Sequence, residues 1–193
     1  MENNEISIKS VAIILTLIIA PIIGILIFNQ FNKSNSKLDS LVNKLAPDFS
    51  LKDRNGNTYS QDNLKGKNVV LFFSEGLSCY PACWNQIAAF ATDPRFIYSD
   101  TLALSVVLDT PQDWNKVTNK IDGIDKANIV FDNGGQVSKE FGMLNATSSM
   151  HSGTAPGHTY VIIDKLGIVK YVYDDPSMAV RNDLIFSELE KLK

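Results

Sequence analysis

Val69 to Phe90 reads VVLFFSEGLSCYPACWNQIAAF, and the other elements of the chain are organised around these residues. The five apolar residues at 69–73 are too few for a globular helix and too apolar for a half-exposed strand, so they predict a strand buried on both faces. A polar loop follows, and Pro81 suits the first turn of a helix whose inner face carries Ile87. The sequence thus places Cys79 at or just before a helix N-terminus, where free N–H groups favour a thiolate over a thiol.

Cys79 and Cys83 are the only cysteines of the chain. A spacing of i, i+4 at a helix start puts their Cα atoms roughly 6 Å apart, inside the disulfide range of about 4.4–6.8 Å. A bridge that closes so short a loop removes little entropy from the unfolded chain, which favours a reversible role over a stabilising one. We therefore predict a functional dithiol or metal pair. An inert local disulfide and two buried thiols are the alternatives.

Length and charge limit the possible functions. A chain of 193 residues suits one domain with an appendage. The net charge is -3 and no basic patch is present, which argues against a nucleic-acid partner.

The appendage is predicted at the N-terminus. From Val11 to Phe28 the chain is apolar apart from one Thr, and about 18 to 20 such residues span the hydrocarbon core of a bilayer. We predict a single-pass anchor at 11–29, preceded by a flank at 1–10 and followed by a polar tether at 30–45. A signal peptide has a shorter apolar core and an A-x-A-like cleavage site, which is absent here.

The orientation of this anchor rests on two opposing arguments. Lys33, Lys37 and Lys44 outnumber Lys9 on the other side, which by the positive-inside rule would put the domain in the cytoplasm. A dithiol domain on a short anchor makes more sense outside the membrane, where cysteines pair stably. We expect the domain to be extracytoplasmic.

Residues 46–193 are predicted to form one α/β domain. A hairpin turns at Asn55-Gly56, and strands then alternate with helices before a closing hairpin and a final helix. The expected strands are 69–73, 102–108, 128–131, 159–163 and 168–173, and the expected helices after the cysteines are 111–121, 137–141 and 182–192. This order predicts a mixed, largely parallel sheet with helices on both faces and the cysteines at the carboxyl end of a central strand.

With these elements in place, the chain resembles the redoxin branch of the thioredoxin fold. That branch includes the peroxiredoxins (alkyl hydroperoxide reductase and thiol-specific antioxidant proteins) and membrane-anchored thiol-disulfide oxidoreductases. The resemblance covers about residues 46–193 and rests on APDFSLKDRNGNTYSQDNLKGKNVVLFF, the cysteine pair, VSKEFGM and PGHTYVIIDKLG. It implies an antioxidant thiol oxidoreductase without a cofactor, acting on protein or small-molecule thiols, disulfides or peroxides. In such proteins a proline, commonly cis, faces the cysteines, and Pro156 looks like its counterpart.

Three departures from the family pattern bear on the chemistry. Peroxiredoxins carry Pro-x-x-x-Thr/Ser-x-x-Cys, and counting back from Cys79 those positions hold Phe72 and Gly76. An Arg that steadies the thiolate in peroxiredoxins falls at His158. The cysteines are spaced CxxxC, whereas thioredoxin-like oxidoreductases use CxxC. The sequence therefore favours dithiol-disulfide exchange over efficient peroxide reduction.

The same spacing supports two other classes of function. SCO-type copper proteins use CxxxC and a distal His on this fold, and they are also anchored by one N-terminal membrane helix. Two thiolates with an imidazole form a ligand set that suits copper. Cys79, Cys83 and His158 would then be the ligands, since His151 is the only other histidine. In a third class, the cysteines are only a local staple in a membrane-tethered binding domain.

Each candidate residue has a functional and a structural interpretation. For exchange, Cys79, which is expected to lie nearer the solvent and the helix dipole, attacks as the thiolate, and Cys83, one turn further inside, resolves the mixed disulfide. Glu75 relays a proton or is a solvated loop carboxylate, and His158 steadies a thiolate, binds metal or caps its loop. The remaining two are Trp84, which forms a rim for the substrate or belongs to the core, and His151, which is expected to face solvent.

Overall fold

The computed structural model describes residues 17, 19–25, 38–97 and 100–192. Within these residues no helix is long and apolar enough to cross a membrane. The predicted flank at 1–10 and most of the predicted anchor at 11–29 lie outside the described residues, so the anchor stays a prediction.

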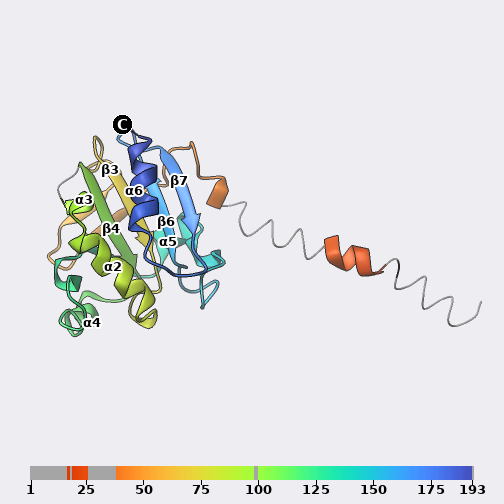
Figure 1. The fold of residues 1–193 in the computed structure, drawn as a ribbon, viewed down its shortest axis with the longest axis horizontal. Helices are drawn as coiled ribbons and strands as arrows, with labels where there is room; N and C mark the ends of the chain where they lie inside the picture. The colour runs from red at the N-terminus through yellow and green to blue at the C-terminus, as the bar shows by residue number, and fades with distance from the viewer. Residues whose placement is uncertain (1–16, 18, 26–37, 98–99, 193) are drawn as a thin grey trace, which may run out of the picture.

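A seven-stranded mixed sheet forms the centre of the domain (Figure 1). Its strands lie in the order β2-β1-β5-β4-β3-β6-β7. In chain order they are β1 (Ser50–Asp53), β2 (Thr58–Ser60), β3 (Asn68–Phe73), β4 (Thr101–Val107), β5 (Ile129–Phe131), β6 (Thr159–Ile163) and β7 (Val169–Asp174). All the predicted strands are present.

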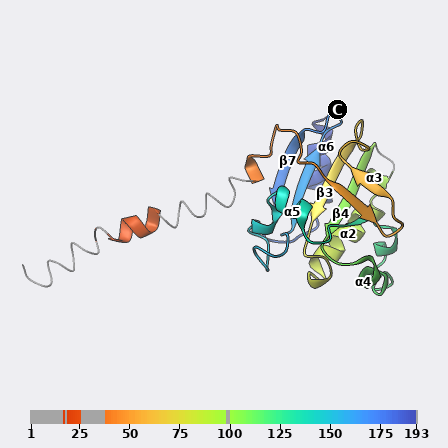
Figure 2. The same cartoon turned by 180° about the vertical axis from the view of Figure 1, so that it is seen from behind.

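Helices cover both faces of this sheet, as Figures 1 and 2 show from opposite sides. They are α2 (Ala82–Thr92), α3 (Pro94–Ile97), α4 (Pro111–Asn115), α5 (Gln136–Glu140) and α6 (Asn182–Glu190), with 3₁₀ turns η1 (Gly76–Ser78), η2 (Ile124–Lys126) and η3 (Met143–Asn145). Successive side chains of β3 point to opposite faces. Leu71 packs in the core that includes Val137 of α5, whereas Phe72 packs in the core with Ile87 of α2 and Ile185 of α6. The prediction that β3 is buried on both faces is confirmed.

The sheet is less parallel than predicted. β3 pairs in parallel with β4, and β4 with β5. β6 runs antiparallel to β3, and β1 antiparallel to β5. The parallel strands β3, β4 and β5 are joined in turn through helices, as parallel pairs require. β1 belongs to a hairpin with β2, and β6, although α5 precedes it, runs in the opposite direction beside β3 and forms a second hairpin with β7.

Helix α4 is shorter than predicted, ending at Asn115 instead of residue 121. Val117 and Lys120 donate their N–H groups to the carbonyls three residues earlier, Trp114 and Val117, so the helix gives way to tight turns. The β-branched Val117 and Thr118 favour helix weakly, which gives a physical reason for the early end. Helix α3, at the predicted break after α2, was not expected.

Residues 38–45, part of the predicted tether, pack against the domain. Leu38 is buried in the same core as Leu71, and Asn43 N–H donates to the carbonyl of Val169 at 2.7 Å. The packed part of the chain therefore begins nearer the N-terminus than residue 46.

Candidate functional site

Both cysteines lie where the chain leaves the sheet at the end of β3 and enters α2. The 3₁₀ turn η1 comes first, and Cys79 directly follows it. Pro81 is the N-cap of α2 and lies just outside the first turn in which it was predicted, and Cys83 stands in that first turn. Cys79 therefore lies just before the helix N-terminus, as the sequence predicts.

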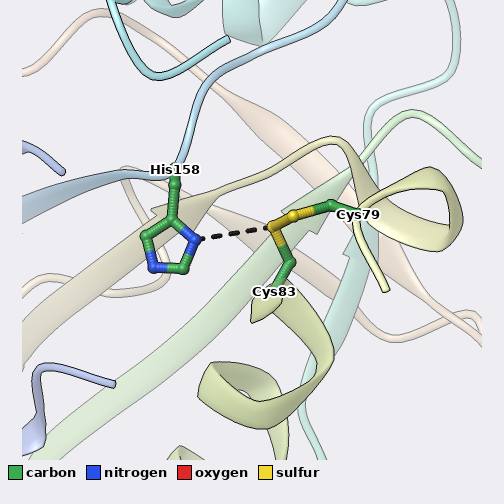
Figure 3. Close-up of side chains that lie close together, drawn as sticks. All are labelled: Cys79, Cys83 and His158. Atoms are coloured by element: carbon green, nitrogen blue, oxygen red, sulfur yellow. Dashed lines mark hydrogen bonds between the residues drawn. A yellow bond between two sulfur atoms is a disulfide. The ribbon is translucent and has the colours of Figure 1, made fainter. Parts of the chain in front are cut away.

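A disulfide joins Cys79 and Cys83 (Figure 3). Their Cα atoms are 5.4 Å apart, which confirms that the spacing allows a bridge. Both side chains are buried, with 3% of Cys79 and 1% of Cys83 exposed. Solvent exposure therefore does not distinguish an attacking from a resolving cysteine in the oxidised state, contrary to the expectation that Cys79 is the more open. Tyr80 between them is 62% exposed and marks the surface above the bridge.

His158, the residue just before β6, contacts the disulfide, as Figure 3 shows. Its Nδ1 lies 3.5 Å from the Sγ of Cys83, and its Nε2 lies 2.8 Å from the hydroxyl of Tyr160. The ring is almost fully buried and meets the edge of Phe72 at 4.6 Å between centroids. Burial lowers the pKa of His158 from 6.5 to about 4. The imidazole beside the sulfurs is therefore neutral at pH 7.

This low pKa predicts a loss of stability in acid. Below its ordinary pKa the unfolded chain binds a proton at His158 that the folded protein excludes, so stability falls as the pH drops from 6.5 towards 4. Between pH 7 and about pH 4.5 the free energy of unfolding should fall by about 2 to 3 kcal/mol from this residue. Urea unfolding of the oxidised protein at the two pH values measures it. His158→Gln should lose this part of the pH dependence and His151→Gln should keep it, so equal pH dependence in both variants would contradict the assignment.

Glu75 is buried, which corrects the expectation of a solvated loop carboxylate. Its side chain is 2% exposed. Its Oε1 accepts hydrogen bonds from Met150 N–H at 2.6 Å, His151 N–H at 2.9 Å and the hydroxyl of Ser149 at 3.2 Å. Its Oε2 lies 2.9 Å from Nδ1 of His151. All these contacts face the 149–151 loop, so Glu75 ties that loop to the cysteine segment and is not aimed at the sulfurs.

His151 faces solvent and Trp84 belongs to the core, and each makes one further contact near the cysteine segment. The ring of His151 is 58% exposed, as expected, but one nitrogen pairs with Glu75. Trp84 is 4% exposed and packs against Trp114 at 5.4 Å between centroids. Its Nε1–H donates to the carbonyl of Gly76 at 3.2 Å. Trp84 therefore belongs to the core and steadies η1, and the exposed aromatic residue at this edge is Tyr80.

Sequence reasoning missed Asp109, whose carboxylate accepts a hydrogen bond from the segment that leads to Cys79. Its Oδ2 accepts from the N–H of Leu77 at 3.0 Å and from Nε1–H of Trp114 at 3.1 Å. Burial raises the pKa of this carboxyl above its usual value. The sequence feature that could have indicated Asp109 is its position two residues after β4, because the end of β4 lies at the same edge of the sheet as the end of β3.

Pro156 is buried ahead of His158, but its expected cis bond is absent. Among the described residues the cis peptide bond is Tyr80-Pro81. A contact between Pro156 and the cysteines stays a prediction.

Three of the predicted residues form a possible metal-ligand set. The ligand atoms of Cys79, Cys83 and His158 all lie within 4.8 Å of one another. A metal needs thiolates, so the set fits a soft cation only after the disulfide is reduced. The Nδ1 of His158 faces the sulfurs and is the atom available as a ligand.

The mixed sheet with a cysteine pair at the start of α2 defines a dithiol protein of the thioredoxin-like fold. Solved structures share this fold. Peroxidoxin BcpB from Mycobacterium tuberculosis aligns with a TM-score of 0.64 and 20% identity over 79% of this chain and 97% of that one. AhpC from Enterococcus faecalis aligns with a TM-score of 0.65 and 20% identity over 78% of this chain and 91% of that one.

Residues 42–172 match the AhpC/TSA family. The chain belongs to that family. It is 30% identical to the chloroplastic peroxiredoxin Q of Triticum aestivum over 68% of this chain and 58% of that one. It is 28% identical to the chloroplastic peroxiredoxin Q of Populus jackii, over 67% of this chain and 58% of the relative. The chain thus spans under two thirds of the length of these relatives.

Proposed function

We propose that this protein is a peroxiredoxin-like thiol oxidoreductase that cycles Cys79 and Cys83 between dithiol and disulfide. The observation that carries the proposal is the bridge at the start of α2 with a neutral imidazole 3.5 Å from one sulfur. Membership of the AhpC/TSA family supports it. The short loop between the cysteines argues against a merely stabilising bridge.

In the proposed reaction, the Cys79 thiolate attacks one sulfur of a substrate disulfide, forming a mixed disulfide and releasing the other sulfur as a thiolate. The helix N-terminus beside Cys79 favours its ionised form. Cys83 then attacks the Sγ of Cys79, the second substrate thiolate leaves, and the proton of Cys83 passes to it. The substrate gains two electrons and the protein becomes the disulfide form. An external thiol returns the protein to the dithiol by the reverse exchange.

Thiols and disulfides of proteins or small molecules are the proposed substrates, and peroxides are the second choice. The two positions where peroxiredoxins carry Pro and Thr/Ser hold Phe72 and Gly76. Phe72 is fully buried and Gly76 has no side chain, so neither supplies a hydroxyl that would hold a peroxide. A peroxide would oxidise Cys79 to the sulfenic acid with release of an alcohol, or of water from hydrogen peroxide, and attack by Cys83 would then release water.

The test is turnover by the full chain with glutathione disulfide and with hydrogen peroxide, each in the presence of dithiothreitol. We expect faster turnover with the disulfide, and none above background for the Cys79→Ser/Cys83→Ser double variant. Activity in the double variant equal to the wild type would overturn the proposal. Faster turnover with peroxide would overturn the substrate preference alone.

A second candidate is copper delivery, favoured by the juxtaposition of Cys79, Cys83 and His158. Bound copper would supply a cargo for transfer and not a reaction of its own. Titration of the reduced protein with Cu(I) under a competing chelator tests it. One equivalent that is lost in His158→Ala would support delivery, and uptake no greater than that of the double serine variant would exclude it.

We also propose that residues 11–29 anchor the protein in a membrane with the domain outside the cytoplasm. The apolar run of the sequence supports this. Expressed with a C-terminal tag, the full chain should stay in the membrane fraction after alkaline carbonate extraction. Protease added outside spheroplasts should remove the tag, and protection of the tag until lysis would reverse the orientation.

A further inference from the structure

A buried chain of hydrogen bonds begins at His158 and leads away from the disulfide. Nε2 of His158 lies 2.8 Å from the hydroxyl of Tyr160, and that hydroxyl lies 2.8 Å from Oε1 of Gln86. Nε2 of Gln86 in turn lies 2.9 Å from Oδ1 of Asn182. Gln86 and Tyr160 are fully buried, and the cysteine chemistry described above uses neither of them.

The donor and the acceptor of each hydrogen bond in this series follow from the contacts of Asn182, the residue furthest from the disulfide. Nδ2 of Asn182 faces two groups that only accept, the carbonyl of Ala89 at 3.0 Å and the carboxylate of Asp93 at 2.9 Å. The Oδ1 of Asn182 therefore faces Gln86 and accepts from its amide nitrogen.

A second contact of Gln86, made by its amide oxygen, independently gives the same orientation of the Gln86 amide group. Its Oε1 accepts the backbone N–H of Arg181 at 2.7 Å, and a backbone N–H only donates. The hydroxyl of Tyr160 faces this same oxygen, which only accepts, so the hydroxyl donates its single proton to Gln86. That proton therefore points away from His158. The other neighbour of that hydroxyl, the carbonyl of Ala179 at 3.3 Å, is likewise only an acceptor.

The tautomer of His158 is then determined. The oxygen of Tyr160 has no proton left for His158, so it accepts one, and Nε2 of His158 carries the hydrogen. A neutral imidazole has one N–H, so Nδ1 carries a lone pair, and this is the atom 3.5 Å from the Sγ of Cys83.

We infer that Tyr160 and Gln86 are positioning residues that hold His158 as the Nε2–H tautomer and thereby assign different tasks to the two cysteines. After reduction, Nδ1 accepts a hydrogen bond from the Cys83 thiol and keeps Cys83 protonated as the waiting, resolving group. Cys79 is left as the thiolate at the helix N-terminus. The opposite tautomer would donate to the sulfur of Cys83 and favour its thiolate instead. This assignment of tasks rests on the proposed function, whereas the tautomer does not.

The tautomer is tested by ¹⁵N nuclear magnetic resonance of the imidazole nitrogens in the reduced and oxidised wild-type protein. His151→Gln leaves a single histidine and so assigns the signals. We expect a protonated Nε2 and an unprotonated Nδ1 for His158. A protonated Nδ1 would overturn the inference whatever the enzymatic activity. Loss of activity with the expected tautomer would count against the proposed function alone.

The division of tasks is tested by Tyr160→Phe, which keeps the ring and removes the hydroxyl. In the reduced wild type, limiting iodoacetamide should alkylate Cys79 about tenfold faster than Cys83, the ratio that one hydrogen bond produces. In Tyr160→Phe the ratio should approach one, and the Nδ1 signal of His158 should shift towards the protonated form.

Tyr173→Phe is the matched control, because its ring stacks on Tyr160 at 6.3 Å and its hydroxyl lies outside the chain of bonds. It should keep both the labelling ratio and the wild-type nitrogen signals. A ratio unchanged in Tyr160→Phe, or changed equally in both variants, would show that the hydroxyl of Tyr160 does not position His158.

Discussion

Cys79→Ser is expected to lower the rate of disulfide exchange about a thousandfold or more, whereas Cys83→Ser should stop the reaction after its first step. Without Cys79 there is no thiolate at the helix N-terminus to attack the substrate. Without Cys83 the mixed disulfide forms on Cys79 and cannot be resolved. Incubation with glutathione disulfide followed by mass determination should find one glutathione per chain of Cys83→Ser and almost none on Cys79→Ser.

The reverse pattern, with glutathione held on Cys83, would exchange the two roles and contradict the hydrogen bond expected between Cys83 and His158. Ser78→Ala is the control for a change next to the cysteines that leaves both sulfurs in place. Ser78 is exposed, and its hydroxyl donates to the carbonyl of Glu75 at 2.8 Å. This variant should react like the wild type.

Gly76→Ala is expected to destabilise the protein by about 3 kcal/mol or more. Gly76 has a φ of +59°, which L side chains rarely adopt. An added Cβ would also lie 2.9 Å from Cγ of Asp109, the carboxyl that holds Leu77 and Trp114. The new methyl group must displace this carboxyl, so the hydrogen bond between Asp109 and Leu77 of η1 is lost. The backbone conformation of residue 76 also becomes unfavourable. Urea unfolding of the oxidised protein measures the change.

Gly134→Ala separates the two causes of that loss. Gly134 has a φ of +84° and nothing within 4 Å of an added Cβ. It should therefore cost about 1 kcal/mol from the backbone alone. Equal losses of unfolding free energy in the two variants would show that the carboxyl of Asp109 moves aside without destabilising the protein.

The fold was predictable because its signals are local. Short apolar runs bounded by turn residues indicated β3, β4 and β6, and the Asn55-Gly56 turn indicated the first hairpin. The cysteine bridge was predictable for the same reason, since residues four apart at a helix start must lie close together. Local signals failed at α4, where weak helix formers followed a good N-cap.

The surroundings of the cysteines were not predictable in the same way. Glu75 looked like a solvated carboxylate because nothing near it in the sequence marks residues 149–151, some 75 positions later, as its hydrogen-bond donors. Asp109 and Gln86 were missed because a single polar residue beside apolar neighbours is indistinguishable in sequence from a surface residue.

Period and spacing along the chain are enough to place the strand, the turn and the helix that carry Cys79 and Cys83, because these patterns act within a few residues. The groups that face the sulfurs depend instead on tertiary contacts. Pairing of β6 beside β3 brings His158 to Cys83 across 75 residues of chain, and packing of α2 and α6 on the sheet then orients its ring through Tyr160 and Gln86. Burial and hydrogen-bond direction at that point depend on groups that the chain brings together only when it folds.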